Sequence, residues 1–102
     1  MRFYGILGFA PVEPPPGIAG RALWVQRDGT QIHLMPRDDA SPQSGHVGIV
    51  VDHYQATLRR LRDDGHEVNR RREHWGAPRA YVRDPAGNLV ELMAWAPGAE
   101  PA

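Results

Sequence analysis

The strongest constraint on the fold is a pair of hairpin patterns, one in each half of the chain. Residues 79–95 read RAYVRDPAGNLVELMAW, in which the turn residues DPAGN separate two runs that suit β-strands. Residues 21–36 read RALWVQRDGTQIHLMP, with an Asp-Gly dipeptide at the expected turn. The last strands, QIHLM and LVELM, align and give His33 and Glu91 equivalent positions. This internal repeat predicts two related modules.

Residues 46–96 are expected to form a complete βαβββ module. HVGIVVD is strand-like, and DHYQATLRRLRDDG predicts a helix that is N-capped by Asp52 and stopped by Gly65. An apolar stripe at helical spacing supports this helix: Tyr54, Leu58 and Leu61. HEVNRRR predicts a weaker strand before the final hairpin.

Residues 1–36 predict an incomplete copy of the same module, in the order (α)-β-β-β, with its opening strand absent and its helix cut short. RFYGILGF suits the last turns of a helix with a glycine stop, and a proline-rich connection leads to the hairpin. We expect residues 37–45 to be a polar linker and residues 97–102 a disordered tail. The fold class is therefore predicted as α+β.

Composition excludes several classes of protein. The 102 residues balance 12 Lys and Arg against 12 Asp and Glu, which gives no electrostatic case for nucleic acid or membrane binding. There is no cysteine, so a metal could be held only by His, Asp, Glu and water. No apolar run approaches the roughly 20 residues of a membrane span. A cytoplasmic protein is the expectation.

Four segments together resemble the vicinal oxygen chelate superfamily, which includes glyoxalases, bleomycin resistance proteins and extradiol dioxygenases. They are RFYGILGF, GTQIHLM, GHVGIVVD with its helix, and YVRDPAGNLVEL. The resemblance covers most of residues 2–95. It implies two βαβββ modules that form a cupped mixed sheet, with a divalent metal inside.

The resemblance also implies site residues. Glu91 falls on the last-strand carboxylate ligand, His46 on the first-strand histidine ligand, and His33 on the last strand of the first module. The implied cofactor is Fe, Mn, Ni, Zn or Mg, or no metal at all. Glu91 would double as the catalytic base. Tyr81 lies ten residues before Glu91 and resembles the tyrosine that hydrogen-bonds substrate in extradiol dioxygenases.

Strand alternation extends this site to side chains that would contact a small-molecule substrate. Gln31 shares a face with His33, and Met93 and Trp95 share a face with Glu91. Arg79 could bind a substrate carboxylate or phosphate through two hydrogen bonds, or be salt-bridged instead. Trp24 would line the same cup.

The implied activity is metal-stabilised enolate or oxyanion chemistry on a substrate with adjacent oxygens, by an isomerase, lyase or ring-cleaving dioxygenase.

The sequence departs from the family pattern in one respect: the first strand of the first module is missing. We expect a late start, a truncation or a partner chain that covers the exposed edge, and a homodimer. Two alternatives remain: a metal-free drug-binding protein of the bleomycin-resistance type, with Trp24, Trp75 and Trp95 for stacking, and a non-catalytic dimer.

Overall fold

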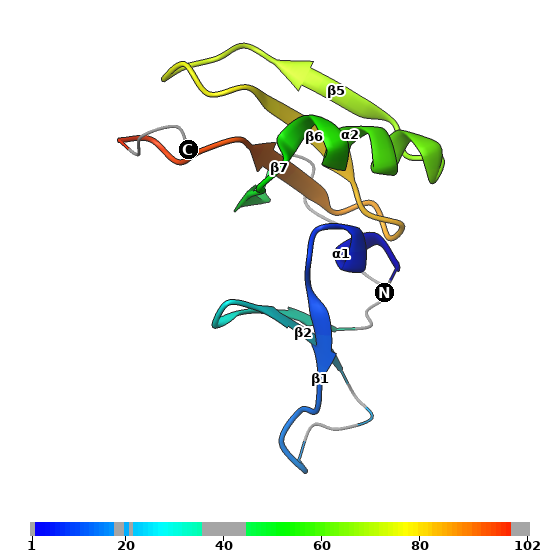
Figure 1. Cartoon of the computed structure of the whole chain (residues 1–102). Coiled ribbons are helices and arrows are strands. Elements are labelled where there is room, and N and C mark those ends of the chain that lie inside the picture. Colours follow the sequence, from blue (N-terminus) through cyan, green and yellow to red (C-terminus); the bar gives the residue numbers. More distant parts are fainter. Residues whose placement is uncertain (1, 18–19, 21, 36–44, 99–102) are drawn as a thin grey trace. The chain divides into compact units, whose positions relative to one another are not determined.

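The computed structural model describes residues 2–17, 20, 22–35 and 45–98, and contains two compact units, Met1–Ala40 and Ser41–Ala102 (Figure 1). The predicted α+β class is confirmed, and so is the order of elements in both halves. The elements are α1 (Arg2–Ile6), β1 (Ala10–Val12), β2 (Leu23–Arg27), β3 (Thr30–Leu34), β4 (His46–Val50), α2 (Tyr54–Asp63), β5 (Val68–Arg71), β6 (Arg79–Arg83) and β7 (Leu89–Met93).

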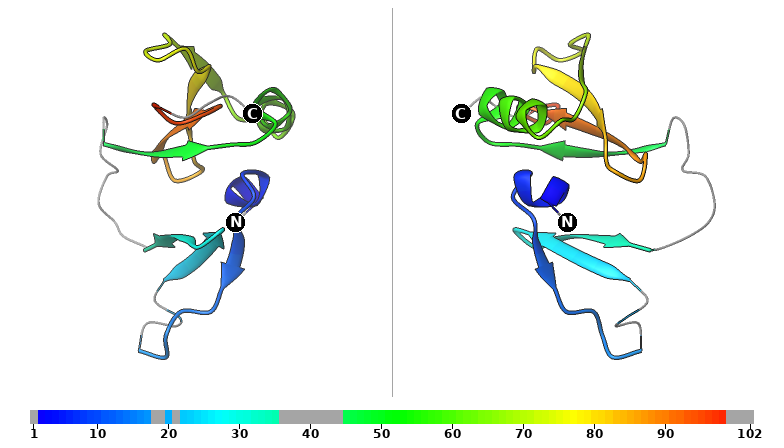
Figure 2. Two further views of the ribbon diagram at one scale, coloured as in Figure 1. Left: turned by 60° about the vertical axis from the view of Figure 1, so that its left-hand side comes forward. Right: turned by 90° about the vertical axis from the view of Figure 1, so that its right-hand side faces the viewer.

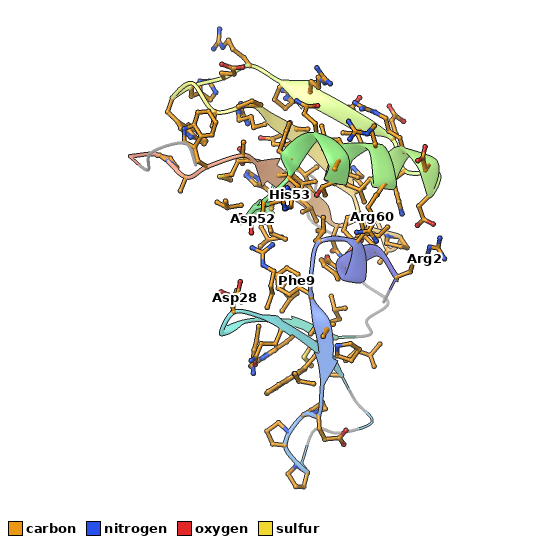
Figure 3. The ribbon with its side chains drawn as sticks, in the orientation of Figure 1. Arg2, Phe9, Asp28, Asp52, His53 and Arg60 are labelled. Carbon is orange, nitrogen blue, oxygen red and sulfur yellow. The ribbon has the colours of Figure 1, made fainter. Side chains whose placement is uncertain are left out.

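The first unit is an antiparallel sheet of order β1-β2-β3 that follows the short helix α1. The predicted glycine stop is present: Gly8 has a φ of +93°, which lets the Phe9 N–H donate to the Tyr4 carbonyl at 3.0 Å. Asp28 and Gly29 both take positive φ at the hairpin turn, as that dipeptide predicts. Figure 3 marks Phe9 just before β1 and Asp28 at the turn. The buried residues of this unit are Phe3, Tyr4, Leu7, Phe9, Ala22 and Val25.

The second unit is a four-stranded mixed sheet of order β4-β7-β6-β5, with α2 packed on one face (Figures 1 and 2). Strand β4 runs parallel to β7, while β6 pairs antiparallel with both β7 and β5. The chain crosses from β4 to β5 through α2, because these two strands run parallel at opposite edges of the sheet and cannot be joined by a tight turn. The complete βαβββ module predicted for this half is therefore formed.

The two faces of this sheet differ in chemistry. Since paired residues lie on the same face, the strand registers place one set of apolar side chains under α2. That set is buried: Ile49, Ala80, Val82, Val90 and Leu92. It packs in the core with the buried face of α2, which consists of Tyr54, Thr57, Leu58 and Leu61. The opposite face, which we call the site face, carries His46, Gly48, Arg79, Tyr81, Glu91 and Met93.

The start of α2 differs from the prediction. The N-cap is His53, not Asp52, and no side chain caps the helix (Figure 3). The Val51 N–H still bonds to the Met93 carbonyl at the end of the sheet, so the chain must turn sharply before the helix can begin. His53 makes this turn in the left-handed region, with φ of 48°. The stop at Gly65 is as predicted, with φ of +93°.

The turn between β6 and β7 is fixed by the buried carboxylate of Asp84. Its oxygens accept hydrogen bonds from the backbone N–H groups of Ala86 and Asn88 and from the Asn88 side-chain amide, at 2.8–3.0 Å. This explains why DPAGN sets the register of the hairpin.

No helix in the described part of the chain is long and apolar enough to cross a membrane. Residues 37–44 of the predicted linker and residues 99–102 of the predicted tail lie outside the described residues. The proposed domain limits therefore stay predictions.

Candidate functional site

Glu91 stands at the centre of β7 and is only 8% exposed. Its neighbours across the sheet are Gly48 on β4 and Tyr81 on β6, both on the site face. A buried carboxylate needs partners that offset the loss of hydration. The structure supplies two of them, one for each carboxylate oxygen.

His46 is the first partner. Its Nε2 atom lies 3.0 Å from Glu91 Oε1, and the histidine side chain is about one-third exposed. The parallel pairing of β4 with β7 brings these residues together across 45 positions of sequence. The two residues that the resemblance predicted as ligands in this module therefore do lie in contact.

Arg79 is the second partner, and it is buried. Its Nη1 donates to Glu91 Oε2 at 3.0 Å, and its Nε donates to the Arg72 carbonyl at 2.7 Å. The pKa of Arg79 is raised above its ordinary value, first by a hydrogen bond with the Tyr81 side chain and then, against the opposing effect of burial, by Glu91. The ion pair compensates the charge of Glu91 and fixes the orientation of its carboxylate.

Tyr81 joins this cluster from β6. Its ring lies 5.5 Å from the His46 ring, and the guanidinium carbons of Arg79 and Arg71 lie 5.7 Å and 5.0 Å from its centroid. Such distances allow cation–π attraction. Tyr81 is half-buried, so part of its side chain remains accessible to a ligand.

Gly48 and Met93 set the space around the carboxylate. A Cβ atom added at Gly48 would lie 3.0 Å from Met93 Cε, so the glycine leaves room that a larger residue would fill. Trp95, predicted on this face, stands beyond the end of β7. Its carbonyl accepts a hydrogen bond from Trp75 Nε1 at 2.9 Å, which ties the loop before β6 to the end of the sheet.

The predicted residues of the first unit form a cluster of their own. The ring of His33 stacks on that of Trp24, with centroids 3.6 Å apart, and His33 Nε2 lies 3.0 Å from Gln31 Oε1. Gln31 also donates to the side chain of Gln26 at 2.8 Å. These side chains share one face of the sheet, as alternation predicted. Because His33 belongs to a different unit from Glu91, its place in a common site stays a prediction.

The donor set of the second unit fits part of a metal site. Two donors about 2.1 Å from one cation and at right angles to each other are about 3.0 Å apart, and His46 Nε2 and Glu91 Oε1 have this separation. Within the described part of this unit no third His, Asp or Glu joins them. A cation there would need further ligands from water or from substrate.

Arg71 was not predicted as a site residue. It is exposed on β5, where it pairs with Arg79, and its side chain lies over Tyr81 beside an open groove of about 840 Å³. Asn69, Tyr81 and Arg83 line the same groove. Two features could have shown that Arg71 lies on the site face. They are the alternation of side chains along the strand VNRR and the pairing of that strand with β6.

Comparisons with known proteins give the family. The model of the Glyoxalase/Bleomycin resistance protein/Dioxygenase superfamily matches residues 1–92. No curated protein sequence matches the chain.

Several solved structures share the fold. A protein described as a glyoxalase family protein from Bacillus anthracis has a TM-score of 0.79 at 24% identity, over 89% of this chain and 76% of that one. The fosfomycin resistance protein FosX from Listeria monocytogenes has a TM-score of 0.74 at 17% identity, over 93% and 78% of the two chains. A glyoxalase/bleomycin resistance protein from Streptomyces sp. CB03234 has a TM-score of 0.67 at 27% identity, over 89% and 84%.

The family match extends over the two hairpins, the crossover helix and the strand that holds Glu91, which are the segments on which the resemblance was based. The chain therefore belongs to the glyoxalase/bleomycin resistance protein/dioxygenase superfamily.

Proposed function

We propose that this chain acts on a small molecule with two adjacent oxygen atoms, at a site built on His46, Glu91 and a divalent cation. The reaction would be that of an isomerase, a lyase or a ring-cleaving dioxygenase. The observation that supports this proposal is the 3.0 Å separation of His46 Nε2 and Glu91 Oε1 on neighbouring parallel strands. Membership of the superfamily is consistent with it.

Each side chain has a distinct part in this proposal. A bound cation would supply Lewis-acid stabilisation of negative charge on the substrate oxygens. His46 and Glu91 Oε1 would hold it, while Arg79 keeps its bond to Glu91 Oε2 and so restricts rotation of the carboxylate. Glu91 would accept the proton removed from the substrate carbon, and the Tyr81 hydroxyl would hydrogen-bond a substrate oxygen.

Arg79 also supports a second candidate, a metal-free protein that binds a small molecule. Glu91 and Arg79 cancel one another's charge, and His46 adds none when neutral, so the cluster offers a cation little net attraction. The same pairing satisfies the site without a metal, because each buried side-chain nitrogen and oxygen in the described residues already has a hydrogen-bond partner. In this candidate the site face would bind a small molecule without chemistry.

Thermal unfolding with added metal separates the two candidates. We expect Mn²⁺, Fe²⁺, Ni²⁺ or Zn²⁺ to raise the melting temperature of protein prepared with a chelator, because a ligand at 100 times its Kd adds about 2.7 kcal/mol. The Glu91→Gln and His46→Ala variants should lose this rise. The matched control is His74→Ala, which removes an exposed loop histidine and should keep it.

The outcomes are distinct. No rise with any of these metals, or an equal rise in Glu91→Gln, would refute the metal site. Quenching of tryptophan fluorescence by bleomycin in a chelator would then support the second candidate. Loss of the rise in His33→Ala would add the first unit to the site, whereas its retention would leave water as the remaining ligand.

A further inference from the structure

We propose that the groove beside Tyr81 binds the anionic end of the substrate, a carboxylate or a phosphate, and that Arg71 is the residue that pairs with it. This inference names the substrate class for the site proposed above and rests on that proposal for the chemistry at the other end of the molecule. The binding of the anion itself does not depend on a metal.

The position of Arg71 is the first reason. Its strand partner is Arg79, and its row of the sheet lies next to the row of Asn69, Tyr81 and Glu91. The Arg71 side chain is exposed and lies over the Tyr81 ring at 5.0 Å, which limits the conformations it adopts. No acidic side chain among the described residues forms a salt bridge with it. Arg71 thus presents a positive charge that is oriented but not compensated.

Arg79, the arginine expected from sequence to bind substrate, has no comparable freedom. Two of its nitrogens are bonded to the Arg72 carbonyl and to Glu91, and it also bonds with Tyr81. An anion that displaced Glu91 from Arg79 would leave a buried carboxylate without its main partner. The two arginines therefore have different roles: Arg79 positions Glu91, and Arg71 is available to a ligand.

The groove itself favours a small anion. Its volume of about 840 Å³ lies in the range of small-molecule sites. The charged side chains of its lining on this face of the sheet are Arg71, Arg83 and Glu67, which leaves an excess of one positive charge. Arg70 lies on the opposite face, where it donates to Gln55 of α2. Asn69 adds an amide donor and Leu89 an apolar surface.

The spacing of the strands gives the size of the ligand. Neighbouring strands are about 4.8 Å apart, so β5 and β7 are separated by roughly 10 Å across Tyr81. A molecule that reaches both Arg71 and Glu91 would carry its acid group only a few bonds from the adjacent oxygens. The substrate class is accordingly a short bifunctional acid.

The test is an NMR titration of ¹⁵N-labelled protein in EDTA, which removes any dependence on the metal. The probes are benzoate and phenyl phosphate, with benzamide as the uncharged analogue of benzoate. We expect saturable shifts at the Asn69 side-chain amide and Arg71 Nε with either anion or both, and none with benzamide. The stronger anion identifies the acid as carboxylate or phosphate.

Two variants give the decisive comparison. Arg71→Gln should weaken binding about tenfold, because a charge-assisted hydrogen bond is lost from a partly solvated site. Arg59→Gln removes an equal charge from an exposed position on α2 and should change the affinity less than twofold. The spectrum of each variant shows whether it is folded. Equal weakening in both variants, shifts outside the groove, or equal binding of benzamide would overturn the inference, while leaving the metal test unaffected.

Discussion

Replacing Arg79 by methionine should destabilise the second unit by about 2 kcal/mol, because it leaves Glu91 buried without its main counter-charge. The side chains of Arg79 and Glu91 are 8% and 11% exposed, so water cannot fully replace the lost partner. Methionine keeps most of the aliphatic volume of arginine, which separates the charge effect from a packing defect.

The magnitude follows from the bonds that are lost. The bond from Nη1 to Glu91 Oε2 joins two charged groups and is the largest contribution, and the Arg72 carbonyl also loses its donor. Removing one member of a fully buried pair costs about 3 to 5 kcal/mol. The smaller figure applies here because His46 stays beside Glu91 and the neighbouring Gly48 is exposed.

The assay is urea unfolding followed by tryptophan fluorescence in a Trp24→Phe background. The remaining tryptophans, Trp75 and Trp95, both belong to the second unit, so the signal reports on that unit alone. The matched control is Arg83→Met, an exposed arginine on the same strand whose Nη1 bonds to the Gly87 carbonyl. It should cost less than about 1 kcal/mol.

A double variant tests the cause. Arg79→Met combined with Glu91→Leu removes both charges, so it should be more stable than Arg79→Met alone. A loss below about 0.5 kcal/mol in Arg79→Met, within the range of an ordinary surface substitution, would refute the reasoning. The reasoning would also be refuted if the loss in the double variant equalled the sum of the losses in Arg79→Met and in Glu91→Leu.

Two further predictions concern the backbone and the hairpin turn. Gly48→Ala should change the free energy of unfolding by less than about 1 kcal/mol, since only the flexible end of Met93 must move. Gly65→Ala should cost about 1 kcal/mol or more, because its φ of +93° is unfavourable for a residue with a side chain. Similar losses for the two variants in urea unfolding would contradict this. Asp84→Ala should lower the free energy of unfolding by about 2 to 3 kcal/mol, since three donors in the turn lose their acceptor. Asp84→Asn should lose less, and equal losses would show that the acceptor is not the cause.

Local sequence signals predicted much of this fold. The turn dipeptide at 28–29, the DPAGN turn and the glycine stops at Gly8 and Gly65 all formed where expected. Each depends on the conformational preference of a few adjacent residues, which acts whatever the rest of the chain does. The start of α2 was wrong by one residue because the end of β4 is fixed by its bond to the distant strand β7.

Alternation along the strands predicted that Glu91 and Met93 share a face, and the resemblance placed His46 near Glu91. Both follow from the period of a β-strand and from the family pattern. The sequence could not tell which arginine would be buried. Arg71 and Arg79 have equivalent positions on paired strands, and both lie beside Tyr81.

The sequence by itself determined the elements, their order and the face on which each strand residue lies, because these depend on local preferences and on a period of two. Only the tertiary structure decided that Arg79 compensates Glu91 and that Arg71 stays open to a ligand. The reason is physical: among the described residues, Arg79 is the one that donates to both Glu91 Oε2 and the Arg72 carbonyl. Its own donors are therefore satisfied in the position in which it compensates the buried carboxylate.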